Sequence, residues 1–129
     1  MKDFCVLING DSSVDKRGRV TFINDFDMKD VKRFYIVENW TEAPRAWHGH
    51  KKESKYVYVP IGTAKIMVKN METGERKDHI LSEHAPQVLH IPPGNYNGSV
   101  SLERGTKIMY FSTSTLEESK ADDFREDYK

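Results

Sequence analysis

One short segment of this sequence, residues 45–55, concentrates the side-chain types that transfer protons and bind anions. It reads Arg-Ala-Trp-His-Gly-His-Lys-Lys-Glu-Ser-Lys and places His48 and His50 two residues apart. Histidine changes its charge near neutral pH, and lysine and arginine hold anions through charge-assisted hydrogen bonds. The segment is therefore the first candidate for a functional site.

The alternation of side chains along a strand assigns these residues to faces. If the segment is extended, His48 and His50 point to the same face, because side chains alternate with period two. In the strand that follows, Lys55 shares a face with Val57 and Val59, so Lys55 is expected to project into an apolar interior. A lysine there needs a partner, and desolvation lowers its pKa. The alternative for each of these residues is an ordinary solvated charge on a loop.

A metal ion is a second use for the same residues. His48, His50 and Glu53 supply nitrogen and oxygen ligands at a spacing similar to that of metal-binding cupin barrels. Those barrels add a histidine from a later strand after a Pro-x-Gly turn, where this chain has Asn97 after Pro92-Pro93-Gly94. Asparagine is a poor ligand for transition metals. The predicted site therefore contains no metal, and a metal-dependent cupin is kept as an alternative.

Short runs with a period of two make up most of the chain. They are rich in β-branched and aromatic residues, and turns such as Lys16-Arg17-Gly18 separate them. This rhythm predicts an all-β sandwich or small barrel, in one domain over residues 1–129. A helix is expected only in the tail, from Leu116 to Tyr128, after a start signal at Thr115. The predicted strands cover residues 4–8, 19–23, 33–37, 55–60, 63–68, 79–81, 87–91, 99–102 and 107–111.

The charge balance excludes some classes of partner. Twenty Lys and Arg residues oppose twenty Asp and Glu residues among 129, which disfavours a general binder of nucleic acid or of an anionic membrane. The charges are unevenly placed, because residues 45–55 hold four Lys or Arg against one acid and residues 117–129 hold six acids against three Lys or Arg. A local excess of cations suits a small anion. With one cysteine, Cys5, expected to be buried, and no membrane-spanning run or signal peptide, we expect a cytoplasmic protein.

The order and spacing of several motifs resemble the dTDP-4-dehydrorhamnose 3,5-epimerase family. These motifs are Arg45-x-x-His48, then Lys55-x-Val57-x-Val59-x-x-Gly62, then Ile91-Pro92-x-Gly94-x-x-Asn97-Gly98. The stretch Arg33-Phe34-Tyr35-Ile36, the run through Lys52 and the acidic ending 122–128 are more similar still to the dTDP-4-keto-6-deoxyhexose 3,4-ketoisomerases and WxcM-like sugar epimerases. The resemblance covers about residues 15–128. It implies a cupin jelly-roll (double-stranded β-helix) with a short C-terminal tail or helix, a homodimer, a dTDP-sugar substrate and no cofactor.

The same resemblance implies roles for individual residues. His48 matches the base that removes a proton next to the sugar ketone, and Lys55 matches the lysine that stabilises the enolate oxygen. Arg45 matches an arginine that binds the diphosphate. An aspartate late in the epimerase chain orients the histidine, and Asp122 or Asp123 is the candidate here. Substrate binding is further assigned to four residues: Arg33, His50, Tyr96 and Asn97.

Two departures leave the specific reaction open. The epimerases carry a tyrosine acid near the last strand, and residues 111–115 contain none. The ketoisomerases usually place Trp-His after the Pro turn, where this chain has Tyr96-Asn97. Tyr35, Tyr96 and Tyr110 are candidate replacement acids, and Tyr35 is the one we assign to catalysis. The leading expectation is an isomerase or epimerase that works by enolisation; a non-catalytic cupin that binds a sugar nucleotide is the alternative from another class.

Overall fold

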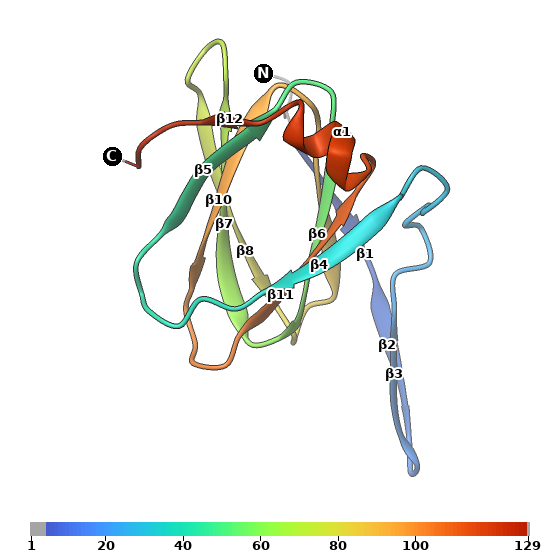
Figure 1. Cartoon of the computed structure of the whole chain (residues 1–129). Helices are drawn as coiled ribbons and strands as arrows, with labels where there is room; N and C mark the ends of the chain where they lie inside the picture. The colour runs from blue at the N-terminus through green and yellow to red at the C-terminus, as the bar shows by residue number, and fades with distance from the viewer. Residues whose placement is uncertain (1–4, 129) are drawn as a thin grey trace.

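The strands form two antiparallel sheets in the computed structural model, which describes residues 5–128 (Figure 1). One sheet has the order β1-β9-β6-β11-β4 and the other β12-β5-β10-β7-β8, while β2 and β3 form a separate hairpin. This arrangement confirms the all-β jelly-roll prediction. The strands are β1 (Val6–Asn9), β2 (Asp11–Asp15), β3 (Gly18–Phe22), β4 (Arg33–Val37), β5 (Arg45–His50), β6 (Lys55–Ile61), β7 (Thr63–Asn70), β8 (Arg76–Ser82), β9 (Gln87–Ile91), β10 (Asn95–Ser101), β11 (Lys107–Ser112) and β12 (Phe124–Arg125).

The core lies between the two sheets and follows the period of two. Along β6, residues 55, 57 and 59 are buried while residues 56, 58 and 60 are only partly so. Cys5 is buried, as expected, and joins this core. Burial of apolar surface of this kind is the main favourable contribution to folding. The buried cluster consists of Cys5, Val57, Val59, Ala64, Ile66, Val68, Leu81, Leu89, Ile91, Ile108 and Tyr110.

The predicted tail helix is too long. Helix α1 covers only Leu116–Lys120, with Thr115 as its N-cap in a capping box with Glu118. The chain then leaves the helical path, because the Asp122 carboxylate accepts hydrogen bonds from the backbone of residues 51–53 and Phe124–Arg125 pair with β5. In Figure 1, α1 and β12 pass over the same end of the two sheets.

Other strand boundaries also differ from the prediction. The strand expected at 4–8 is β1, Val6–Asn9, and Phe4 lies outside the described residues. Strand β2 was not expected. The β2–β3 hairpin extends away from both sheets (Figure 1), and nearly all of its residues are exposed. Among residues 5–128 there is no helix with the length and hydropathy that a bilayer crossing requires.

Candidate active site

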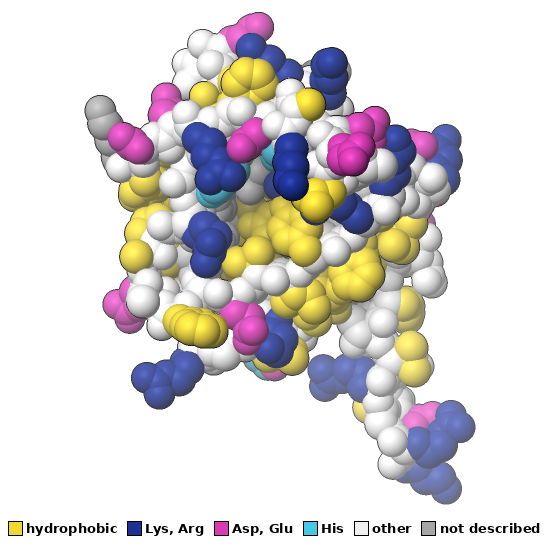
Figure 2. All heavy atoms as spheres, in the orientation of Figure 1, with side chains coloured by type: hydrophobic (Ala, Val, Ile, Leu, Met, Phe, Trp, Pro, Cys, Tyr) yellow, Lys and Arg dark blue, Asp and Glu magenta, His cyan; other side chains and the backbone are white. Residues whose placement is uncertain are grey.

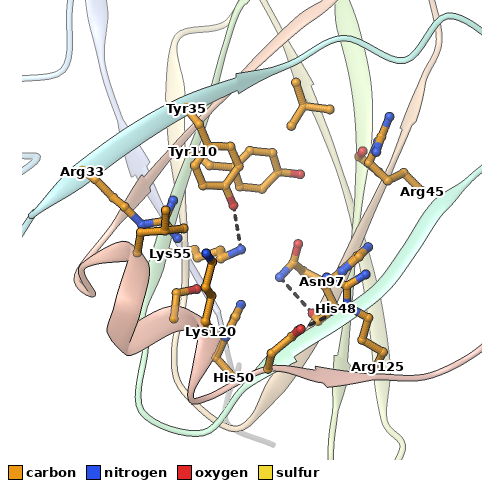
Figure 3. A pocket seen from close by; sticks show the side chains of 15 residues that line it. Arg33, Tyr35, Arg45, His48, His50, Lys55, Asn97, Tyr110, Lys120 and Arg125 are labelled. Carbon is orange, nitrogen blue, oxygen red and sulfur yellow. Dashed lines mark hydrogen bonds and ion pairs between the residues drawn. The ribbon is translucent and has the colours of Figure 1, made fainter.

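The two sheets enclose a cavity of about 410 Å³ at the end crossed by α1 and β12 (Figure 3). Seven of the eight residues assigned from sequence line it, from strands that are distant in the chain. Five further lining residues, Leu116, Ser119, Lys120, Asp123 and Arg125, come from the C-terminal segment. The full lining is Arg33, Tyr35, Val37, Arg45, His48, His50, Lys55, Asn97, Ser99, Tyr110, Leu116, Ser119, Lys120, Asp123 and Arg125.

Lys55 projects into the cavity from the start of β6 and is 8% exposed. Its Nζ donates a hydrogen bond of 2.6 Å to the hydroxyl of Tyr35 and lies 5.3 and 5.6 Å from the ring centroids of Tyr35 and Tyr110. The two tyrosine rings are stacked, with centroids 5.2 Å apart. Burial lowers the pKa of Lys55, and the nearby Glu53 carboxylate opposes that shift. The structure therefore confirms the inward lysine.

Glu53 is the partner that a buried lysine requires. Its side chain is fully buried, and its carboxylate lies 3.7 Å from Lys55 Nζ and 3.7 Å from His50 Nε2. Within the described residues, neither carboxylate oxygen accepts a hydrogen bond. Glu53 thus balances the lysine charge without occupying its hydrogen-bond donors, and the ammonium keeps N–H groups free for an oxygen in the cavity.

His48 faces the cavity from the middle of β5 and is half-buried. Burial lowers its pKa, and the charges of Arg125, Lys55 and Arg45 lower it further, whereas Asp123 raises it. The imidazole is therefore mostly neutral at pH 7, the form that accepts a proton. No hydrogen bond to this ring is formed within the part of the chain that the structure describes.

His50 shares the cavity face with His48, as the period of two predicts. Its Nδ1 lies 2.6 Å from the carbonyl oxygen of Asp122. A carbonyl only accepts, so Nδ1 carries the proton and Nε2 points toward Glu53. The three-residue metal set is not brought together, because among residues 5–128 no group of three His, Cys, Asp or Glu side chains is placed to hold a metal ion.

Arg45 reaches the cavity through a bulge. Asn97 pairs with His48 and Ser99 pairs with Arg45. Between these two pairs the chain advances three residues along β5 but only two along β10. The extra residue turns Arg45 to the face of His48, which strict alternation would forbid. Asn39 accepts a 2.9 Å hydrogen bond from Arg45 Nε and donates one of 3.0 Å to the Ser99 hydroxyl. This contact fixes the guanidinium at the cavity wall.

Arg33 and Asn97 also line the cavity, but Tyr96 does not. The guanidinium of Arg33 lies 5.1 Å from the Tyr35 ring centroid. Asn97 donates a hydrogen bond to the carbonyl of His48. Tyr96 is the next residue on the same strand and therefore points to the opposite face, where its ring lies 5.5 Å from Lys69 Nζ. Tyr96 therefore lies apart from this cavity, and its assignment to substrate binding stays a prediction.

The two tail aspartates have different positions. Asp122 is turned away from His48, and its carboxylate accepts backbone hydrogen bonds from Lys51, Lys52 and Glu53. Asp123 lines the cavity, but its carboxylate pairs with Arg125 at 3.3 Å. The predicted aspartate–histidine hydrogen bond is therefore not formed by either residue.

Sequence reasoning missed Lys120 and Arg125. Lys120 lies in no motif, and Arg125 lies in the acidic ending 122–128, where a role was assigned to the aspartates and none to the arginine. The sequence indicates only that the dipeptide Phe124-Arg125 is compatible with a strand. Nothing in the local sequence specifies that it pairs with the edge of β5.

A family model described as FdtA, WxcM-like, C-terminal, matches residues 4–129. A search of the curated proteins finds no match.

Several solved structures share the fold. The sugar 3,4-ketoisomerase QdtA from Thermoanaerobacterium thermosaccharolyticum, in complex with TDP, is 24% identical with a TM-score of 0.79, over 98% of this chain and 90% of that one. A 3,4-ketoisomerase from Helicobacter canadensis is 20% identical with a TM-score of 0.77, over 95% and 90%. The 3'-monoepimerase ChmJ from Streptomyces bikiniensis, in complex with dTDP-quinovose, is 14% identical with a TM-score of 0.81, over 95% and 69%.

Proposed function

We propose that this chain, which belongs to the FdtA family (WxcM-like, C-terminal), is a nucleotide-sugar epimerase or ketoisomerase. The substrate is a dTDP-4-keto-6-deoxyhexose, and the reaction proceeds by enolisation without a cofactor. The main support is that His48 and Lys55, from different sheets, line one cavity that also contains Arg45. The similar structures that contain TDP or a dTDP-sugar support the choice of substrate.

In this proposal His48 is the base. Its neutral imidazole takes the proton from the carbon next to the C4 ketone, and the electron pair moves onto the ketone oxygen. Lys55 donates a hydrogen bond to that developing oxyanion, whose charge a desolvated ammonium stabilises strongly. The hydroxyl of Tyr35 accepts from Lys55, so its own proton is directed elsewhere and is available to the sugar.

The enolate has two productive fates. A proton returned to the same carbon from the opposite face inverts that carbon, which is epimerisation. Transfer of the C3 hydroxyl proton to the C4 oxygen, together with delivery of a proton to C4, moves the ketone from C4 to C3, which is ketone migration. Both fates begin with the same proton abstraction, so one experiment tests the proposal.

That experiment is solvent exchange. Incubation with TDP-4-keto-6-deoxyglucose in deuterated water is expected to introduce deuterium next to the ketone, at C3 or C5 before any migration, as followed by NMR. His48→Ala is expected to abolish the exchange, whereas His84→Ala, at a histidine whose side chain is 77% exposed, leaves it unchanged. Tight binding of the sugar nucleotide without any incorporation of deuterium would contradict the proposal that the protein catalyses enolisation.

The same result would favour a non-catalytic cupin that binds a sugar nucleotide. One observation supports this second candidate: among the described residues no side chain forms a hydrogen bond that orients the His48 imidazole. A binding protein has no need of such an orienting contact, whereas a general base usually has one.

The proposal includes a homodimer of single-domain chains, residues 1–129, in the cytoplasm. Support for a dimer comes from exposed apolar side chains on one sheet, because Phe34 and Ile36 of the edge strand β4 are 61% and 52% exposed. The projecting β2–β3 hairpin adds Val14 and Val20, which are exposed to a similar degree. A second copy of the chain would cover such surfaces and an open strand edge.

A further inference from the structure

The acidic side chains of the C-terminal segment, residues 116–128, are mostly engaged away from the cavity. Glu118 accepts hydrogen bonds from the backbone of Thr115 and from Lys32. Asp122 accepts three backbone hydrogen bonds from residues 51–53. Glu126 pairs with Lys69 on the outer face of the sheet. A segment with net negative charge therefore presents little of that charge to the cavity.

The two cations of the same segment point the other way. Arg125 pairs with His48 in the β12–β5 register, and antiparallel partners project to the same face. Both Arg125 and Lys120 line the cavity, and Figure 3 shows Lys120 and Arg125 among the side chains that surround it. The backbone hydrogen bonds between Trp47 and Glu126, one in each direction, hold this strand in place.

The cavity wall consequently carries a strong excess of positive charge. Its lining includes five cationic side chains, Arg33, Arg45, Lys55, Lys120 and Arg125, and one acidic side chain, Asp123. Figure 2 shows Lys and Arg side chains gathered around a hollow with a hydrophobic floor. Asp123 and Arg125 pair at 3.3 Å with side chains 38% and 66% exposed. An exposed pair of this kind is weak, so a multivalent anion can displace Asp123.

We propose that Lys120 and Arg125 bind the diphosphate of the nucleotide sugar together with Arg45, so that the C-terminal segment completes the anion site. This inference rests on the proposed function for the identity of the ligand. A diphosphate needs several donors at once, and a guanidinium supplies two parallel ones. Arg45 lies on β5 three residues before His48, and Arg125 lies beside His48. The two arginines are therefore placed to contact the diphosphate while the sugar lies over the base.

The test is a comparison of ligands by calorimetry. Arg125→Gln and Lys120→Gln are each expected to weaken dTDP binding about tenfold, the usual cost of losing a charge-assisted hydrogen bond. Inorganic pyrophosphate is expected to lose affinity in parallel, and thymidine, which lacks phosphate, to bind as it does to the unaltered protein. Arg104→Gln, at an exposed cation outside the cavity, is the matched control and should leave dTDP affinity within twofold of its original value. Thermal melting confirms that each variant is folded.

The outcomes separate this inference from the proposed function. If Arg45→Gln weakens dTDP binding and the Arg125 and Lys120 variants do not, the inference is wrong and the enzyme assignment stands. If those variants weaken dTDP and pyrophosphate but no sugar exchanges deuterium, the anion site stands and the enzyme assignment falls. If the unaltered protein binds neither dTDP nor pyrophosphate, both are wrong.

Discussion

Lys55 carries its charge in a place that disfavours charge. Its side chain is 10% exposed, and desolvation alone would drive it toward the neutral amine. The Glu53 carboxylate at 3.7 Å offsets this tendency without taking up the donors of the ammonium. We interpret Glu53 as the residue that keeps Lys55 able to stabilise an enolate.

The first prediction concerns Glu53→Gln, which keeps the size of the side chain and removes its charge. Without the carboxylate the pKa of Lys55 falls further, so the charged form, and with it the deuterium exchange, is lost at a lower pH than in the unaltered protein. At pH 8 the exchange rate should drop about tenfold, equivalent to about 1.4 kcal/mol of transition-state stabilisation. The measurement is the pH profile of exchange.

Two controls accompany that profile. Binding of dTDP should change little, because Glu53 lies behind Lys55 and does not line the cavity. In a Lys55→Met background, Glu53→Gln should add no further loss, since the carboxylate acts through the lysine. An alkaline limb at an unchanged pH would refute this role for Glu53.

The second prediction concerns the acid limb of the same profile. The His48 pKa is lowered by burial and by the neighbouring Arg125, so the imidazole stays neutral, and active as a base, at pH values below its ordinary pKa of about 6.5. Exchange should therefore stay near its maximum down to below pH 6.5 and fall only in more acidic solution. Arg125→Gln should move this midpoint upward and Asp123→Asn should move it downward.

The shift can also be followed without any reaction. NMR titration of the His48 ring, identified by its loss in His48→Ala, gives the midpoint directly. His90 has a pKa lowered by burial and serves as the internal control, because neither substitution alters its surroundings. Movement of the His48 midpoint in the opposite direction would contradict the electrostatic account.

At the scale of elements, the β5–β6 turn determines how the catalytic strands meet. Asp122 accepts hydrogen bonds of 2.8, 2.8 and 3.1 Å from the backbone of Lys51, Lys52 and Glu53. Burial raises the pKa of Asp122, but these three donors outweigh it and hold the pKa below its usual value. The tail thus fixes the turn that carries Glu53 into place.

The third prediction is that Asp122→Ala destabilises the fold by about 2 kcal/mol at pH 7, because it leaves three backbone donors without their acceptor, two of them part-buried and that of Glu53 buried. Since the folded pKa is depressed, the contribution of Asp122 is fully present above the unfolded pKa of about 3.9 and is lost as the pH falls through the folded value. The difference in unfolding free energy between the unaltered protein and the Asp122→Ala variant should therefore shrink toward zero at acid pH. Urea unfolding at several pH values measures it.

Asp123→Ala is the matched control for this element. Its carboxylate makes no backbone contact of this kind, and its side chain is 38% exposed, so the change in stability should stay within about 0.5 kcal/mol. Equal destabilisation by both substitutions would show that the turn does not depend on Asp122.

Much of this architecture could be predicted from the sequence, because period-two runs rich in β-branched residues report which face a strand buries. Strand β4 was predicted at its observed bounds, and the inward direction of Lys55 followed from Val57 and Val59. Strand β2 was missed, since its sequence Asp-Ser-Ser-Val-Asp has neither alternation nor strand-forming composition. Its pairing with β3 comes from the turn between them.

The site was less predictable because it depends on contacts between distant segments. Alternation correctly placed His48 and His50 on one face, but assigning both Tyr96 and Asn97 to the cavity ignored the same rule. The inward turn of Arg45 needs a bulge that only the partner strand reveals. The entry of Arg125 depends on the path of the tail, which no local pattern encodes.

At the scale of the molecule, the overall neutrality of the chain conceals a separation of charge. The cavity is cationic, with Asp123 as its one acidic lining residue, while Asp122 faces the backbone of residues 51–53 and Glu126 faces the outer surface. The apolar surface is also uneven, because Phe34 and Ile36 extend outward from the edge strand β4. Exposure of apolar side chains to water is unfavourable, and a second chain that covers them removes this unfavourable contribution.

The fourth prediction is that Phe34→Glu with Ile36→Glu converts the proposed homodimer into a monomer. Both side chains are exposed within one chain, so the substitutions leave the core intact, whereas two buried carboxylates at an interface are strongly unfavourable. Sedimentation equilibrium over about a hundredfold range of protein concentration should give the dimer mass for the unaltered protein and the monomer mass for the variant. Ile80→Glu, at a similarly exposed residue of β8, should remain dimeric. A monomer mass for the unaltered protein at every concentration would remove the dimer, and the apolar face would then need another partner.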